Sequence, residues 1–182
     1  MKKIASNTFE KISLGAGVLL NRFTTVGEIV DADIICATRG GSTLSVPSGL
    51  RNISVDGVRT NTRESYVVDG YAPTFAFTAL TADKEMVQLA LGIADIVDGK
   101  VVPKHENDNK YFKDVYWVGE RSDGTAIVFC LKQALSTGGL SWKNNDKGES
   151  ESSITLTGNY TADDQDTAPF WFQEIATATT GA

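Results

Sequence analysis

Residues 114–132, DVYWVGERSDGTAIVFCLK, decide the fold class of this 182-residue chain. Two runs rich in β-branched and aromatic residues flank a polar segment that contains Ser122, Asp123 and Gly124. Strands favour such residues, and the glycine can take the positive φ that a tight hairpin turn needs. Because residues 127–131 are apolar at every position, the second strand is predicted to lie at the centre of a sheet with both faces buried.

Similar runs occur on both sides of this hairpin. Phe75 and Phe77 alternate with small residues in PTFAFTAL, which places both rings on one face of a strand. The stretch 138–160 is typical of a second hairpin, around the polar turn NNDKG. Further strands are predicted at residues 43–46, 51–58, 64–71 and 169–175. The chain is therefore expected to contain about eight strands.

One segment has the period of a helix. Met86, Leu89 and Ile93 recur at helical spacing, and acidic residues precede them. Thr81 is the expected N-cap and Gly92 the expected stop, so a helix is predicted at about residues 82–92. Its single apolar stripe predicts that it lies on a sheet.

These elements predict one domain, residues 1–182, of mainly β structure: a β-sandwich or barrel with one flanking helix. Residues 1–35 have no clean period and are broken by glycines, so they are expected to form an irregular first strand or a partly extended N-terminal arm. Residues 98–113 are expected to form a long polar loop, and residues 176–182 a flexible tail.

The net charge of −6 is unevenly distributed. Residues 1–63 carry 8 Lys and Arg against 5 Asp and Glu, whereas residues 64–182 carry 9 against 18. Tight nucleic-acid binding uses clustered Lys and Arg to neutralise phosphates, and this chain has no such cluster. The charge pattern therefore disfavours a DNA-binding protein, and it fits either simple solubility or complementary ends of an assembly.

The sequence has little catalytic equipment. His105 is the only histidine, and no P-loop, dinucleotide-binding or serine-hydrolase motif is present. Cys36 and Cys130 have no metal-site spacing and are predicted to be core residues. The stretches 106–109 and 163–166 offer oxygen ligands for calcium without the spacing of a calcium-binding loop, and such residues also cap turns. No enzyme, cofactor or metal site is predicted, and calcium binding by these two stretches is left open.

No segment approaches the roughly 20 apolar residues that span a bilayer. The start of the chain lacks the apolar core of an export signal, so a protein kept in the cytoplasm is expected.

One predicted strand has an entirely hydrophilic face. In GESESSITLTGNY, residues 148–160, Ile154, Leu156 and Tyr160 occupy one set of alternate positions. The other set contains no apolar residue and consists of Glu149, Glu151, Ser153, Thr155, Thr157 and Asn159. Such a face either meets the outer solvent or lines a water-filled pore.

Aromatic residues gather at Tyr116 and Trp117, at Trp142 and at residues 170–172. Exposed aromatics would suit a β-sandwich that binds carbohydrates or a receptor, which is the alternative interpretation. Large aromatics in strands are more commonly core or interface residues. In the final strand Trp171 points away from the two phenylalanines, so this strand is apolar on both faces and is predicted to contact another subunit.

Four segments together resemble the tail tube proteins, or major tail proteins, of long flexible-tailed phages of Gram-positive bacteria and of related prophages and tailocins. These segments are LGAGVLLNRF (14–23), ATRGGSTLSV (37–46), VYWVGERSDGTAIVFCLKQALSTGG (115–139) and DKGESESSITLTGNYTADDQDTAPF (146–170). The resemblance implies a non-enzymatic β-sandwich subunit that forms six-membered rings, stacked into a tube through which DNA passes without specific binding. The implied partners are further copies of the chain, a tape-measure protein, and tail terminator and tip proteins, in a virion tail assembled in the host cytoplasm.

Two sets of candidate site residues accompany this resemblance. The hydrophilic positions from Glu149 to Asn159 are the candidate lining of the channel. The candidate subunit interface consists of Leu14, Val18, Leu19, Leu20, Phe170, Trp171 and Phe172. Uncovered sheet edges can pair with a neighbouring subunit, and head-to-tail stacking joins two different faces, which the uneven charge would suit.

Overall fold

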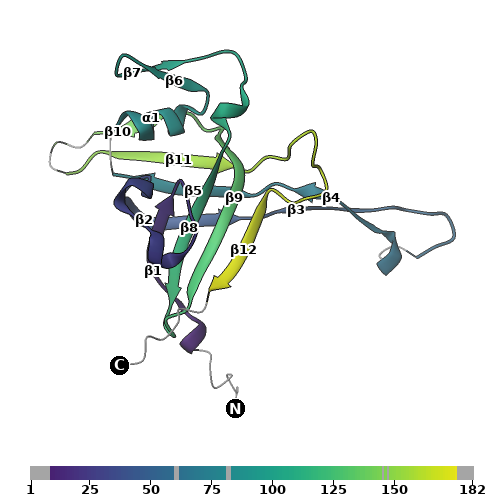
Figure 1. Ribbon diagram of the computed structural model, residues 1–182. Coiled ribbons are helices and arrows are strands. Elements are labelled where there is room, and N and C mark those ends of the chain that lie inside the picture. The colour runs from purple at the N-terminus through teal and green to yellow at the C-terminus, as the bar shows by residue number, and fades with distance from the viewer. Residues whose placement is uncertain (1–8, 60–61, 81–82, 145, 147, 176–182) are drawn as a thin grey trace.

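The computed structural model describes residues 9–59, 62–80, 83–144, 146 and 148–175 (Figure 1). These residues are mainly β, with antiparallel strands and one α-helix, as the sequence predicted. The strands are β1 (Ser13–Leu20), β2 (Thr38–Ser45), β3 (Ser48–Asn52), β4 (Tyr66–Tyr71), β5 (Thr74–Ala79), β6 (Ala94–Val97), β7 (Lys100–Pro103), β8 (Lys113–Arg121), β9 (Ala126–Ser136), β10 (Ser141–Lys143), β11 (Glu151–Thr157) and β12 (Phe170–Ile175). The helix α1 is Lys84–Leu91, and short 3-10 turns lie at Phe9–Lys11, Val26–Glu28, Asp31–Asp33, Arg63–Ser65 and Asn109–Tyr111.

The predicted central hairpin is formed by β8 and β9, joined by a turn in which Gly124 has a φ of 79°. The first part of β9 pairs with β8 on one side and with β12 on the other. Residues 126–131 are buried, because both faces of the strand are covered. The sequence prediction of a central, fully buried strand is confirmed.

A bulge near Gln133 carries β9 from one half of the sheet to the other. The φ of Gln133 is 47°, and the pairing register between β8 and β9 shifts at this point. Asp114 Oδ1 accepts a hydrogen bond from the Gln133 N–H at 2.9 Å, so the amide that the bulge removes from the ladder is still paired. A bulge bends a strand, and the end of β9 thereby reaches β11.

Two half-sheets result. The first contains β1, β8, β9 and β12, and the second contains β2, β5 and β11, with β10 beside β11. The strands of the two half-sheets cross steeply (Figure 1). The main core lies between them and includes Leu19, Phe75, Phe77, Met86, Val115, Phe129, Leu131, Ile154 and Leu156. A smaller cluster around Leu20, Val118 and Val128 is covered by Phe23 and Ile29 from the loop 21–37. Cys36 and Cys130 are buried free thiols, as predicted.

The helix α1 agrees with the predicted segment 82–92, but its cap differs. Asp83 is the N-cap, and its Oδ1 accepts from the Met86 N–H at 2.7 Å. Thr81, the expected cap, lies outside the described residues. Gly92 ends the helix with a φ of 74°, as predicted, and packs so closely on β9 that a Cβ there would be 2.7 Å from the Ser136 carbonyl oxygen. Met86 and Ala90 bury the apolar stripe in the core.

Beyond the second half-sheet, β2 and β5 continue as a projecting ribbon of β3 and β4 (Figure 1). We call β3, β4 and the described part of their connection the arm, and β2 with β5 the inner half of this long hairpin. Pairing stops at Ser45↔Thr74 and resumes at Ser48↔Tyr71, so two residues on each strand separate the two parts. The predicted strand at 51–58 ends at Asn52, and the rest of that run lies in the connection.

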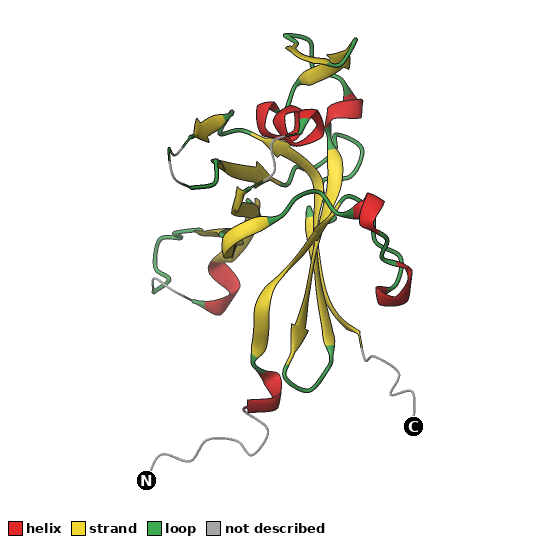
Figure 2. Ribbon diagram, turned by 90° about the vertical axis from the view of Figure 1, so that its left-hand side faces the viewer, coloured by secondary structure: helices red, strands yellow, loops and turns green. Residues whose placement is uncertain are grey.

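Of two predictions about irregular segments, the long loop at 98–113 is wrong and the irregular first strand is confirmed. The expected loop 98–113 contains β7, which pairs with β6 around a turn at Asp98 and Gly99. This hairpin lies beside α1 at one end of the molecule, opposite the β8–β9 turn (Figure 2). Residues 1–35 were expected to form an irregular first strand or a partly extended arm, and the described residues follow the first alternative: β1 pairs with β8 with a register shift between Leu14 and Val18, and the loop after it packs on the first half-sheet. Residues 1–8 and 176–182, the rest of that segment and the expected flexible tail, lie outside the described residues.

Candidate functional surfaces

The outward face of the second half-sheet carries mainly hydroxyl side chains. In the antiparallel register Thr155 is opposite Ala76, and Ala76 is opposite Thr43, so these residues share one face. We call this surface the hydroxyl face. Its residues are Arg39, Thr43, Ser45, Thr74, Ala76, Thr78, Ser141, Lys143, Glu151, Ser153, Thr155 and Thr157. The largest uncharged side chain among them is threonine, so apart from Arg39, Lys143 and Glu151 the surface carries only short side chains.

Burial alternates along the two central strands of this face. Ile154 and Leu156 of β11 are buried, while Ser153, Thr155 and Thr157 are not. The predicted hydrophilic face of β11 is therefore confirmed as an outward face, and its role as the lining of a channel stays a prediction. In the same way β5 buries its phenylalanines and turns its threonines outward.

The two ends of the predicted face behave differently from its middle. Glu149 precedes β11 and is bonded to an arginine. The Asn159 side chain turns back to the main chain, where its Nδ2 donates to the Gln133 carbonyl at 2.8 Å and to the Thr157 carbonyl at 2.9 Å. Asn159 is therefore a structural anchor, and the candidate lining is better described by residues 151–157.

Arg39 on the hydroxyl face is paired with two carboxylates, one on the face and one just before β11. Arg39 Nη2 lies 2.6 Å from Glu149 Oε2, and Arg39 Nη1 lies 3.0 Å from Glu151 Oε1. Hydrogen bonds to Glu149 and then Glu151 raise the pKa of Arg39, while a backbone N–H and Arg39 lower the pKa of Glu149. Lys143 is in register with Glu151, so two cations accompany two anions. Glu149 and Glu151 are thus both paired with Arg39, and hydroxyl groups make up most of the surface.

Sequence reasoning found one strand of this face and missed the others. The outward direction of Thr74, Ala76 and Thr78 could be predicted from the alternation in PTFAFTAL, because both phenylalanines lie on the opposite face. Arg39 gave no such signal, since it lies 110 residues from Glu149 in the sequence. The edge strand β2 is also irregular, with a register shift at the adjacent glycines, Gly40 and Gly41.

The arm is the second notable surface. Leu50 and Val68 are paired across its two strands, and they are 58% and 51% exposed. Its other exposed large apolar residues are Ile53, Val55, Val58, Tyr66, Val67 and Tyr71. Its ion pair Arg51–Asp69, with Nε 2.8 Å from Oδ2, ties the two strands together. Large apolar side chains exposed in this number on one projecting element are typical of a surface that contacts a partner.

The seven predicted interface residues fall into different environments. Leu19 and Leu20 are buried in this chain's own core, so these two predictions are wrong. Phe170 and Trp171 are half-buried against the two core clusters. Val18 and Phe172 are exposed and remain candidates, with Phe172 at 57%. The side chain of Leu14 lies outside the described part of the chain.

The aromatic clusters are used mainly for packing. Phe170 stacks on Phe129 with ring centroids 6.0 Å apart, and Trp171 meets Tyr116 edge-on at 6.1 Å. Trp117 is packed against Gly17, where a Cβ would clash with the indole nitrogen. Trp142 is exposed and donates its indole N–H to Asn144 Oδ1 at 2.8 Å. These contacts do not assemble the predicted clusters into one stacking platform for a sugar.

The residues considered for chemistry are also dispersed. His105 lies exposed in the loop after β7. Asp108 accepts from the Lys110 N–H and Asp164 from the Thr167 N–H, so both acidic stretches cap local turns. Among the described residues, no group of three or more His, Cys, Asp or Glu side chains could hold a metal ion. No helix in the described ranges has the length and apolar character to cross a membrane.

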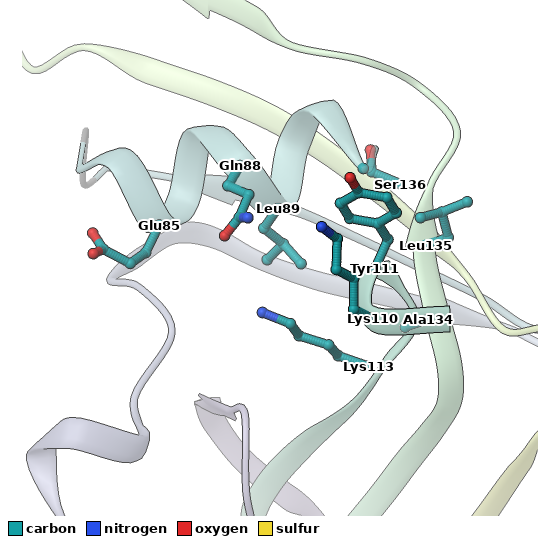
Figure 3. A pocket seen from close by; sticks show the side chains of 10 residues that line it. Glu85, Gln88, Leu89, Lys110, Tyr111, Lys113, Ala134, Leu135 and Ser136 are labelled. Atoms are coloured by element: carbon teal, nitrogen blue, oxygen red, sulfur yellow. The ribbon is translucent and has the colours of Figure 1, made fainter. Parts of the chain in front are cut away.

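A small cavity of about 50 Å³ lies between α1, the turn at residues 109–111 and the end of β9 (Figure 3). Gln88 Nε2 at its wall donates to the Ala94 carbonyl at 2.7 Å. Lys110 Nζ and Tyr111 Oη are held by Asp95 Oδ1, at 2.9 and 3.2 Å. Its volume suits water-sized occupants, and these polar groups already have partners within the chain.

No protein-family model and no curated protein matches the sequence. Among solved structures, a chain from the tail of an empty GTA particle is 9% identical, with a TM-score of 0.44, over 80% of this chain and 92% of that one. A chain from the virion of a native gene transfer agent particle is 10% identical, with a TM-score of 0.43 and the same coverage. A chain of the anti-feeding prophage cap, a tube-terminating cap, is 11% identical, with a TM-score of 0.49, over 95% and 93%. At these identities and scores, the function has to be inferred from the surfaces of the chain itself.

Proposed function

We propose that this chain is a non-enzymatic structural subunit of a phage or phage-like tail tube, built as one domain that assembles with copies of itself into stacked rings. The observation that carries the proposal is the arm, which projects from a well-packed sandwich and exposes paired apolar residues such as Leu50 and Val68. Exposed apolar area of this extent is stabilised when a partner covers it. A projecting element and the body that receives it are different surfaces, so the contact is heterologous and can build rings or tubes.

The hydroxyl face is the proposed lining of the channel. Threonine and serine side chains hydrogen-bond to water, and Arg39 is already engaged by two carboxylates, so this face has no cluster of free cations that would hold phosphates. DNA would therefore pass without specific binding. β2 lies at the end of the strand order of its half-sheet, so it offers an edge at which a neighbour's sheet could continue.

In the more specific form of this proposal, six subunits form each ring, and the tube belongs to a long flexible-tailed phage of Gram-positive bacteria or to a related prophage or tailocin. A tape-measure protein, a tail terminator and tip proteins are the proposed further partners. The proposed location is the virion tail, after assembly in the host cytoplasm. Val18 and Phe172 are proposed subunit contacts alongside the arm, since both are exposed.

Assembly is tested directly by microscopy. Purified protein, concentrated or supplied with its tail-tip nucleus, should form rings and tubes in negative stain. The arm variant Leu50→Ser/Val68→Ser should stay folded and form neither, because the apolar contact is lost. The matched control is Val30→Ser, which removes a side chain of similar exposure, 53%, from the loop over the first half-sheet. A parent protein that remains monomeric under these conditions would contradict the proposal.

The channel assignment is tested by labelling. Cys36 and Cys130 are buried, so an introduced cysteine can be modified selectively. Thr155→Cys should react with a small thiol reagent in both monomer and tube, and with a reagent wider than the lumen only in the monomer. Glu106→Cys, in the loop after β7, is the control that should react with both reagents in both states. Fast labelling of Thr155→Cys in tubes by the wide reagent would place the hydroxyl face on the outside.

A further inference from the structure

The joint between the inner half and the arm is a weak point in the long hairpin. Pro47 and Pro73 lie in the two-residue breaks, and proline cannot donate a ladder hydrogen bond. One backbone bond, from the Ala72 N–H to the Pro47 carbonyl at 3.1 Å, spans the described break. Because both strands have two residues here, the register continues across the joint. Backbone pairing therefore fixes the register of the two strands in the arm. It fixes the angle between the arm and the body less firmly.

Tyr160 contacts the arm at this joint. Its Oη accepts a hydrogen bond from the Tyr71 N–H at 2.9 Å, at the end of β4 nearest the body. Gly70 lies against the same tyrosine, since a Cβ there would be 3.4 Å from the Tyr160 oxygen. The Tyr71 ring also meets Phe170 of β12 edge-on, with centroids 5.6 Å apart. The loop that follows β11 thus reaches the root of the arm (Figure 1).

Tyr160 is itself held firmly by the body. The Asn159 N–H donates to the Lys132 carbonyl at 3.2 Å, and its side chain bonds two further carbonyls, as described above. The Gly158 N–H donates to the Pro73 carbonyl at 3.0 Å. A Cβ at Gly158 would be 2.9 Å from the Pro169 carbonyl oxygen, so this part of the loop is closely packed. A rigid chain of contacts therefore runs from β9 through Asn159 and Tyr160 to the arm.

We propose that Tyr160 is a positioning residue that fixes the angle of the arm and thereby makes assembly efficient. This inference rests on the proposed function, in which the arm docks on another copy of the chain. A five-residue strand is roughly 17 Å long, so a change of about 10° at the joint moves its far end by about 3 Å. A displacement of that size is enough to misalign a packed interface, and a tube repeats the same contact many times.

The angle can be measured on the monomer. Spin labels at Val58→Cys in the arm and Glu120→Cys on β8 report the distance between arm and body by pulsed electron resonance. Tyr160→Phe keeps the ring and removes only the hydroxyl that accepts the Tyr71 N–H. The parent should give a narrow distance distribution and Tyr160→Phe a broader or shifted one. The concentration at which tubes form should rise about two- to tenfold, the range expected for one lost hydrogen bond.

The matched control is Tyr111→Phe, which removes a hydroxyl bonded to Asp95 Oδ1 of β6 at 3.2 Å. It should leave both the distance distribution and the assembly concentration unchanged. The midpoint of thermal unfolding separates a general loss of stability from a loss of arm positioning. A distribution for Tyr160→Phe that matches the parent overturns the proposal, and so does a broadened distribution with normal assembly. If the parent forms no tubes, the proposed function fails, while the monomer distances still decide whether Tyr160 orients the arm.

Discussion

The inner half and the arm are two parts of the same long hairpin, yet they have opposite environments. In the inner half, β5 lies between β2 and β11, and it buries Phe75 and Phe77 in the core. In the arm, β4 pairs only with β3 in its two-stranded sheet, and Val67 and Val68 are exposed. Both segments are rich in strand-forming residues, so the difference lies in the number of neighbours. Strand propensity determines that a ribbon forms, whereas pairing partners determine whether its side chains are buried.

The largest expected effect comes from truncating one side chain in each part. Phe77→Ala should lower the free energy of unfolding by about 3–5 kcal/mol, because it leaves a cavity in the core. Val68→Ala should change it by less than about 0.5 kcal/mol, since the side chain is solvated in the monomer. Denaturant unfolding of both variants as monomers provides the comparison. A large loss for Val68→Ala would show that the arm packs on its own body.

The joint between the two parts should be the next most sensitive site. Gly158→Ala should cost about 1–3 kcal/mol, because the new Cβ would meet Leu131 Cδ1 at 2.7 Å and the Pro169 carbonyl at 2.9 Å. The control is Gly27→Ala, where nothing lies within 4 Å and little change is expected. Thermal unfolding measures both variants. Equal midpoints would mean that the joint has more room than its contacts indicate.

A smaller effect on stability is expected at high pH from Cys36, which precedes β2 of the inner half. Burial, with a smaller contribution from Asp83, raises the pKa of Cys36 from 9.0 to about 11. As the pH rises, the unfolded chain loses the thiol proton before the folded chain does. The stabilisation that comes from the neutral, buried thiol is therefore fully present below pH 9 and is lost as the pH rises through 11. As the pH rises from 8 to 10, the free energy of unfolding should fall by about 1 kcal/mol less in Cys36→Ala than in the parent. Identical pH profiles from denaturant unfolding would contradict this assignment.

The smallest effect on stability is expected on the hydroxyl face of the inner half. Glu149→Gln/Glu151→Gln frees Arg39 from its two partners, so assembled tubes should retain DNA at low salt and release it as salt rises. The control Glu28→Gln/Glu106→Gln makes the same charge change at exposed sites away from this face. Fluorescent DNA retained on a sizing column measures the difference. If both variants retain DNA equally, Arg39 does not lie on the path of the DNA.

Much of the inner fold could be predicted because its signals are local. The run at residues 127–131 indicated a central strand, and Phe75 with Phe77 indicated a buried face. The missed hairpin β6–β7 had a local signal too, in the Asp98-Gly99 turn between apolar runs. Leu19 and Leu20 were misassigned because an apolar pair looks the same whether it is buried in its own chain or against another.

The features that only the tertiary structure decided depend on contacts between distant segments. The Gln133 bulge relies on Asp114, the ion pairs of the hydroxyl face on Arg39, and the root of the arm on Tyr160. None of these pairings follows from period or composition, because each joins groups whose proximity is set by the sheet register. The sequence by itself determined the alternation that separates Ile154 and Leu156 from the outward threonines, since side-chain direction in a strand has a period of two residues. Only the assembled sheet decided that those threonines lie beside the threonines of β5 and that β4 projects without a third strand, because neighbouring strands are chosen by packing across the whole chain.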